Sequence, residues 1–239
     1  MEENKMSSYR KYFTLSYDDG VIWDIPFLKI INDCGLKATF NLNSGLLGQK
    51  VDITQNGITF NHDKVDPEQV RALYAGHEIA THAVTHPNLC SLSDEEIRAQ
   101  ICGDREALSA LAGYDVCGHA YPGGAYDERV AGVLAQCGIR YARTIVSTHS
   151  FAMPENLMIW HPTCYHQEDV LFDLADEFLR DEPRDSDLLF YVWGHTYEFN
   201  IWDNWDRIRR FCEKMAGHPD ITYATNLEIA ERAAAGKTI

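Results

Sequence analysis

Two adjacent carboxylates, Asp18 and Asp19, follow a strand-like run from Tyr12 to Tyr17 and precede Gly20. Neighbouring carboxylates repel each other unless a cation compensates their charge. A metal ion provides that compensation, and it allows one aspartate to bind the ion while the other accepts a proton from water. The Asp-Asp-Gly triplet also suits a simple turn, so on its own it leaves both interpretations open.

Two histidines, His82 and His86, lie four residues apart within the segment Gly76 to Pro87. In one helical turn this spacing places both imidazoles on one side, within reach of one ion. The pair follows a predicted strand, Glu78 to Thr81, as the aspartates follow the first strand. Together with an aspartate, two histidines form the kind of three-ligand set that leaves a position open for water or substrate.

Two further strand ends carry residues that suit an active site. The segment His119 to Gly124 breaks into a glycine turn, which is either an ordinary loop or a place where backbone N–H groups line an oxyanion site. His195 follows a buried-strand pattern from Leu188 to Trp193. Because active-site residues of α/β barrels gather at the C-terminal ends of several strands, the four strand ends together predict one shared site.

Strand-like runs alternate with helical segments through the rest of the chain. The other predicted strands are Thr39 to Leu42, Ile139 to Thr144 and Ile221 to Ala224. The predicted helices are Asp24 to Cys34, a helix capped by Asp66, Asp94 to Leu111, Asp127 to Gln136, Gln167 to Leu179, Trp205 to Met215 and Leu227 to Ala234. This alternation is typical of βαβ units and a parallel sheet. We expect a closed or nearly closed α/β barrel.

We expect one domain over residues 1–239, with the motifs in a core of about 12–225. The stretch Asn43 to Asp63 is polar and contains glycines, which predicts an irregular insertion or a small hairpin after the second strand. No repeat or linker in the sequence marks a second domain.

Composition limits the partners, the cysteine chemistry and the location that we expect for this protein. The net charge of −15 repels polyanions, so neither nucleic acid nor an acidic membrane surface is an expected partner. The seven cysteines include no Cys-x-x-Cys pair, which argues against a zinc knuckle or a disulfide framework. The polar segment Met1 to Lys11 lacks the apolar core of a signal peptide. We therefore expect a cytoplasmic protein, whose oligomeric state the sequence leaves open.

The motifs resemble those of the NodB-homology polysaccharide deacetylases, also called carbohydrate esterase family 4. Ser16-Tyr17-Asp18-Asp19-Gly20 resembles the family's first motif, Thr-Phe-Asp-Asp-Gly, and Gly76 to Pro87 resembles its second motif. Motif order and spacing agree from about Thr14 to His195. The resemblance implies a deformed (β/α) barrel of seven or eight strands and a metal-dependent hydrolase that removes acetyl groups from an N- or O-acetylated carbohydrate.

Carried over residue by residue, the resemblance makes Asp18 the general base and His195 the general acid. The implied metal ligands are Asp19, His82 and His86. A Zn²⁺ ion suits this set best, and Co²⁺ or Ni²⁺ would also bind. The resemblance further implies that the metal and the backbone N–H of Gly123 hold the oxyanion.

Two departures from the family's pattern concern groups around the catalytic residues. The third motif usually carries an arginine that pairs with the catalytic aspartate, but Ala120 stands at that position, and Gly123 replaces an aromatic residue. Losing the cation should raise the pKa of Asp18, so we expect Arg143 to supply the charge from the next strand. The family's fourth motif, an Asp-Trp element that orients the catalytic histidine, has no clear counterpart.

Several aromatic residues near the motifs could stack on a sugar ring, and we expect Tyr121 and Trp160 to do so ahead of the others. Two other functions remain open. The same site could hydrolyse a small or cyclic amide, because the chemistry serves any amide. Alternatively, the chain could be an inactive carbohydrate-binding domain, although the intact set of five motif residues argues against decay.

Overall fold

The computed structural model describes residues 9–55, 57–183 and 185–235. The first strand, β1 (Lys11–Asp18), is buried along its whole length. The other strands of the main sheet are β2 (Ala38–Leu42), β5 (Glu78–Thr81), β6 (Gly118–Ala120), β7 (Tyr141–Arg143), β8 (Cys164–Tyr165), β9 (Leu188–Gly194) and β10 (Ile221–Tyr223). Their order is β7-β6-β5-β2-β1-β9-β8, and β10 pairs with β1. All of these pairings are parallel.

The sheet curls so that its two ends approach each other. The chain just before β8 forms an isolated parallel bridge between Trp160 and Arg143, the last residue of β7. Trp160 N–H donates to Ala142 O at 2.9 Å, and Thr144 N–H donates to Trp160 O at 2.9 Å. The parallel sheet and its surrounding helices confirm the predicted α/β deformed barrel.

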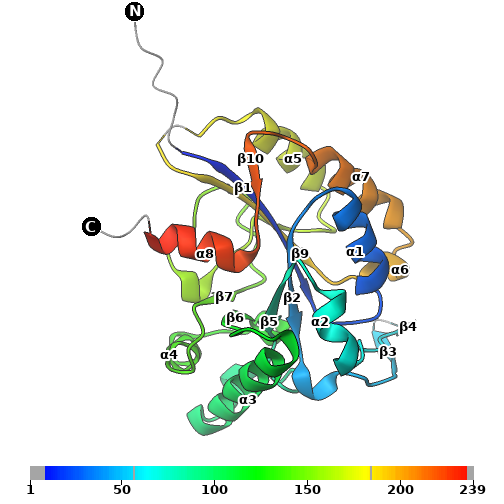
Figure 1. Ribbon diagram of the computed structural model, residues 1–239, viewed down its shortest axis with the longest axis vertical. Coiled ribbons are helices and arrows are strands. Elements are labelled where there is room, and N and C mark those ends of the chain that lie inside the picture. The colour runs from blue at the N-terminus through cyan, green and yellow to red at the C-terminus, as the bar shows by residue number, and fades with distance from the viewer. Residues whose placement is uncertain (1–8, 56, 184, 236–239) are drawn as a thin grey trace, which may run out of the picture.

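Helices pack around the sheet on opposite sides (Figure 1). They are α1 (Asp24–Asp33), α2 (Val70–Leu73), α3 (Asp94–Ala112), α4 (Glu128–Gln136), α5 (Leu171–Arg180), α6 (Glu198–Ile201), α7 (Trp205–Met215) and α8 (Asn226–Ala235). In Figure 1, α1, α5 and α7 lie together on one side, and α3, α4 and α8 lie on the other. Within the described ranges, no helix is both long and apolar enough to cross a membrane.

Side-chain caps mark where α3 and α4 begin. Ser93 and Glu96 form a reciprocal capping box at the start of α3, and the Asp127 side chain caps α4. The predicted cap at Asp66 is wrong, because its side chain makes no cap bond and a 3₁₀ turn, Pro67–Gln69, precedes the short α2. The predicted helix start at Gln167 is also wrong, because α5 begins at Leu171.

A two-stranded antiparallel hairpin lies outside the main sheet, as predicted for Asn43 to Asp63. It consists of β3 (Asp52–Gln55) and β4 (Ile58–Asn61). The chain that leaves β4 is tied to the segment after β1: Ile22 N–H donates to Asp63 O at 2.8 Å, and Val65 N–H donates to Gly20 O at 2.9 Å. The hairpin is therefore held against the C-terminal end of β1, where the two adjacent aspartates lie.

Candidate active site

Asp18 and Asp19 lie where β1 ends. The parallel register pairs Asp18 with Asn41 of β2, and the Asn41 side-chain amide donates to Asp18 Oδ1 at 2.8 Å. Asp19 adopts a φ of 81°, in the left-handed region that is costly for a non-glycine residue. Gly20 follows with a φ of 59°, and a Cβ atom there would lie 2.7 Å from Leu42 Cδ2. The strand end thus turns sharply and separates the two carboxylates.

His82 and His86 lie on a loop after β5, and the predicted helical turn is wrong. Two left-handed residues, Ala83 with φ 61° and His86 with φ 59°, bend this loop back on itself. The Asn43 side-chain amide donates to the carbonyl oxygens of His82 and Ala83, at 2.5 Å and 2.8 Å. A loop rather than a helix therefore brings the two imidazole rings to 4.7 Å between centroids.

Asp19, His82 and His86 offer ligand atoms that all lie within 4.8 Å of one another. His82 Nδ1 donates to Ala120 O at 2.7 Å, which leaves Nε2 with a free lone pair. Burial lowers the pKa of His82 to about 4, so its imidazole is neutral at neutral pH. A neutral imidazole and an ionised carboxylate are the forms that bind a divalent metal, so this donor set fits one.

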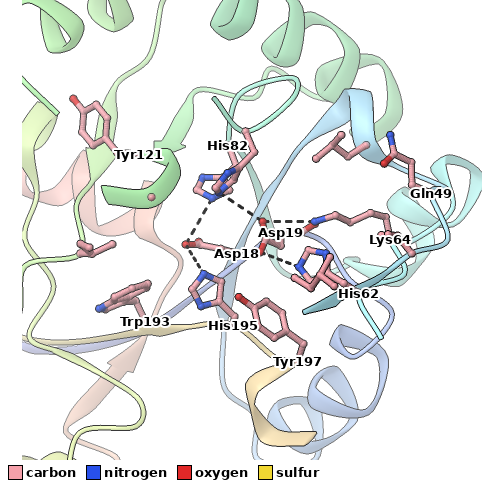
Figure 2. A pocket seen from close by; sticks show the side chains of 16 residues that line it. Asp18, Asp19, Gln49, His62, Lys64, His82, Tyr121, Trp193, His195 and Tyr197 are labelled. Atoms are coloured by element: carbon pink, nitrogen blue, oxygen red, sulfur yellow. Dashed lines mark hydrogen bonds and ion pairs between the residues drawn. The ribbon is translucent and has the colours of Figure 1, made fainter. Parts of the chain in front are cut away.

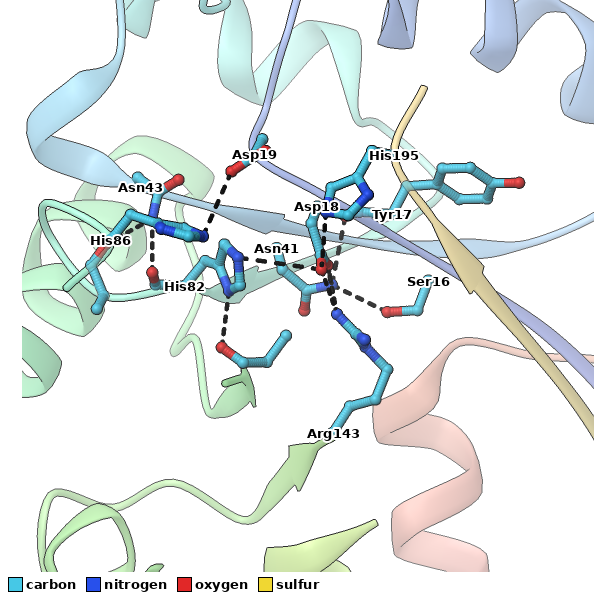
Figure 3. A network of polar contacts seen from close by, with 12 residues as sticks. Ser16, Tyr17, Asp18, Asp19, Asn41, Asn43, His82, His86, Arg143 and His195 are labelled. Atoms are coloured by element: carbon cyan, nitrogen blue, oxygen red, sulfur yellow. Dashed lines mark hydrogen bonds and ion pairs between the residues drawn. The ribbon is translucent and has the colours of Figure 1, made fainter. Parts of the chain in front are cut away.

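Asp18 lies between three cationic or titratable side chains (Figure 3). Arg143 Nη2 donates to both carboxylate oxygens at 2.5 Å, and Nε2 atoms of His82 and His195 lie 3.9 Å from Oδ2. Burial alone would raise the pKa of Asp18, but Arg143 and these histidines lower it overall. The expected contact between Arg143 and the aspartate pair is therefore present at Asp18, although β2, β5 and β6 lie between β1 and β7 in the sheet order.

We predict that Arg143→Met destabilises the fold strongly. The Arg143 and Asp18 side chains are both buried, so the substitution removes the arginine that donates to both carboxylate oxygens and leaves His195, at 3.9 Å, as the nearest cation. Breaking a buried ion pair in this way costs about 3–5 kcal/mol. Urea unfolding of the two proteins measures the difference. Arg140→Met, which breaks a half-exposed pair with Glu231, serves as the control and should cost at most about 1 kcal/mol. Equal losses in both variants would contradict the prediction.

His195 follows β9, and a residue that sequence reasoning missed forms an ion pair with its ring. Glu198, in the first turn of α6, places Oε1 3.2 Å from His195 Nδ1. Its Oε2 accepts from the His195 backbone N–H at 3.2 Å and lies 2.8 Å from His166 Nε2. Burial alone would lower the pKa of His195, but Glu198, together with the two aspartates, raises it to about 9. Glu198 could have been found from its position three residues beyond His195.

Two more residues missed in the sequence come from the chain that follows the hairpin. His62 Nε2 lies 3.3 Å from Asp19 Oδ2, and Lys64 Nζ donates to Asp19 O at 2.8 Å. Burial would raise the pKa of Asp19, but Lys64 and His62, together with His195 and His82, hold it well below its usual range. No motif in the sequence marks either residue, because their role depends on how the hairpin returns to β1.

These residues line one cavity of about 520 Å³ (Figure 2). It is lined by Asp18, Asp19, Leu46, Gln49, Val51, Ile53, His62, Lys64, His82, His86, Tyr121, Gly123, Ile145, Trp193, His195 and Tyr197. Gly123 adopts a φ of 61° in the turn after β6. All predicted site residues except Arg143 and Trp160 therefore line the cavity, and Arg143 reaches the site through its contact with Asp18.

The predicted role of Trp160 in binding a sugar is wrong for this cavity. Its side chain is buried in the core, with its ring 5.5 Å from Tyr141 and 4.9 Å from Tyr191. The backbone bridge to β7 holds it there. Tyr121 does line the cavity, but its hydroxyl donates to Met158 O at 2.7 Å. Trp193 and Tyr197 provide further aromatic surface on the cavity wall.

Comparison with known proteins connects this site to two family models. A model described as polysaccharide deacetylase matches residues 5–142. A model described as glycosyl hydrolase family 57 matches residues 74–228. Only the first match includes Asp18 and Asp19.

Curated relatives agree with the first model. A peptidoglycan-N-acetylglucosamine deacetylase of Bacillus cereus is 34% identical over 104 residues, which are 42% of this chain and 32% of the relative. Chitin deacetylase 1 of Cryptococcus neoformans var. grubii is 28% identical over 126 residues, which are 52% of this chain and 24% of the relative. The matched segments thus span about a quarter to a third of these relatives' length.

The fold is shared with solved structures. A Mycobacterium smegmatis protein assigned to the polysaccharide deacetylases superposes with a TM-score of 0.69 at 17% identity. The superposition covers 98% of this chain and 93% of that protein. At this level of identity the likeness concerns the arrangement of strands and helices.

Proposed function

Because this chain belongs to the polysaccharide deacetylase family, we propose that it is a metal-dependent hydrolase that removes acetyl groups from an N- or O-acetylated carbohydrate. The observation that carries the proposal is the joint placement of the candidate base, three candidate ligands and the candidate acid around one cavity. These five residues are Asp18, Asp19, His82, His86 and His195.

Asp19, His82 and His86 would hold a divalent cation. When bound, this cation lowers the pKa of an attacking water and stabilises the negative charge that develops on the carbonyl oxygen. Asp18 takes the proton from the attacking water. Its carboxylate is suited to this role because Asn41 and Arg143 fix both oxygens and favour the ionised form.

His195 gives a proton to the leaving nitrogen or oxygen. The Glu198 carboxylate orients the His195 ring and favours the protonated imidazolium at neutral pH. The Gly123 N–H, from a turn that lines the cavity, would stabilise the oxyanion. Base and acid thus approach the acyl carbon from different strand ends.

Acetate release from a panel of acetylated compounds tests the proposed reaction. The panel contains acetylated chito-oligosaccharides, acetylated xylan and small N-acetyl compounds. The small compounds are included because a cavity of about 520 Å³ lies in the size range of small-molecule sites. We expect acetate from at least one of the two carbohydrates. Release from small N-acetyl compounds alone would favour the small-amide alternative, and no release at all would favour an inactive binding domain.

We predict that Glu198→Gln shifts the alkaline limb of the pH–activity profile. A general acid works only while protonated, so activity falls as pH rises through the pKa of His195. Removing an opposite charge at this distance lowers that pKa by about 1–3 units. The limb should therefore move to lower pH in the variant, measured as kcat against pH. An unchanged alkaline limb would contradict the role given to Glu198.

A further inference from the structure

The β3–β4 hairpin continues into a short segment, residues 62–65, that runs beside the turn after β1. An isolated antiparallel bridge joins Lys64 to Val21, and two backbone hydrogen bonds flank it. The stem of the hairpin is closed by His62 N–H donating to Val51 O and Lys64 N–H donating to Gln49 O, both at 2.8 Å. The backbone of this segment is therefore fixed on both sides.

This segment places two side chains against a single carboxylate. In Figure 2, His62 and Lys64 both reach Asp19 from the hairpin side of the cavity. Lys64 is buried, donates to the Asp19 carbonyl at 2.8 Å and places Nζ 3.6 Å from Oδ1. It holds the backbone of a residue whose φ of 81° is unfavourable.

His62 acts on the other carboxylate oxygen. Its Nε2 lies 3.3 Å from Asp19 Oδ2, and because an ionised carboxylate only accepts hydrogen bonds, Nε2 carries the donated proton. The remaining oxygen, Oδ1, is the one that lies 3.9 Å from His86 Nε2. The hydrogen bond therefore leaves Oδ1 facing His86, with Lys64 Nζ 3.6 Å from the same oxygen.

The His62 ring is itself held in place. It packs edge-on against Tyr197, with centroids 4.9 Å apart, and Phe60 of β4 stacks on Tyr197 at 5.0 Å. His62 is only 8% exposed. Its orientation is thus fixed by the contact between the hairpin and the loop that carries His195.

We propose that His62 is a positioning residue for the metal centre, which makes the β3–β4 hairpin part of that centre. His62 is not one of the three grouped ligands. It acts through Asp19, by fixing which oxygen faces the ion. The inference rests on the proposed function, because it requires that Asp19, His82 and His86 bind a metal. Outer hydrogen bonds of this kind typically change metal affinity by about 10–100-fold.

Metal affinity of four proteins tests the inference: wild type, His62→Ala, His62→Gln and Thr59→Ala. Glutamine can present an N–H near the position of Nε2, so it should restore part of the effect. Thr59→Ala is the matched control, because it removes only the 2.8 Å hydrogen bond between Thr54 and Thr59 hydroxyls on the exposed hairpin. Each metal-stripped protein is titrated with Zn²⁺ against a chromophoric chelator, after circular dichroism has verified its fold.

We expect Kd for Zn²⁺ to rise about 10–100-fold in His62→Ala. It should rise less in His62→Gln and stay at the wild-type value in Thr59→Ala. An unchanged Kd in His62→Ala, or a Kd in His62→Gln as weak as in His62→Ala, would overturn the inference while leaving the proposed function intact. If the wild-type protein itself bound no metal, the proposed function would fail first.

Discussion

Asp18→Asn should reduce kcat for acetate release by about 10²–10⁴-fold, the contribution expected of a general base. An amide cannot take a proton from water, yet it has nearly the same shape as the carboxylate. The three candidate metal ligands are left in place, so bound metal should stay at the wild-type stoichiometry. Initial rates of acetate release, with metal analysis of the same samples, measure both effects.

The Arg143 ion pair adds a second expected result for this variant. Asp18→Asn leaves the buried Arg143 guanidinium without its carboxylate, although it keeps a hydrogen bond to Thr144 O and its contact with the Trp193 ring. The variant should therefore unfold more easily than wild type. Asp115→Asn, which changes an exposed aspartate paired with Arg105, is the matched control and should keep full activity. Wild-type turnover in Asp18→Asn would remove Asp18 from the mechanism.

His82→Ala should abolish both metal binding and activity. The substitution removes one of three ligands, and the remaining Asp19 and His86 form an incomplete set. It also removes the donor to Ala120 O, so the loop after β5 loses a contact with the end of β6. We expect substoichiometric metal after dialysis and acetate release at the background rate.

The control for this variant is His218→Ala. His218 lies between α7 and β10, where its ring contacts the Lys214 carbonyl, and β10 pairs with the start of β1, at the opposite end of that strand from Asp18. It should bind metal and release acetate as the wild type does. A His82→Ala protein that retained full metal content would show that the ion binds elsewhere.

The fold could be predicted largely because the strands are short, apolar and regularly interrupted. Glu78–Thr81 and the helix Trp205–Met215 match the prediction residue for residue. The start of α5 could not be predicted, because Glu168 accepts a hydrogen bond from Tyr165 N–H at 2.9 Å and holds the preceding residues in a turn. A side-chain contact across three residues decided the boundary there.

The site was predictable where a residue directly ends a strand. Asp18, His82 and His195 follow this rule, and Arg143 reaches Asp18 because parallel strand ends meet at one edge of the barrel. His62 could not be found in the same way, because it depends on a hairpin that folds back onto β1.

The prediction that Trp160 stacks on a sugar ring was wrong for a related reason. Aromatic residues near the motifs do not reveal which of them pair with a strand through their backbone. Trp160 pairs with Arg143 of β7 in this way, and its side chain lies in the core. Side chains on loops and at sheet closures thus depend on long-range contacts that a single sequence does not reveal.

The most direct test of the account is acetate release by the wild-type protein before metal removal, after it, and after restoring one equivalent of Zn²⁺, Co²⁺ or Ni²⁺. The account predicts that stripping abolishes release from the acetylated carbohydrate substrate. At least one of the three ions should restore it. Acetate release that continued unchanged in the fully stripped protein would contradict the central claim.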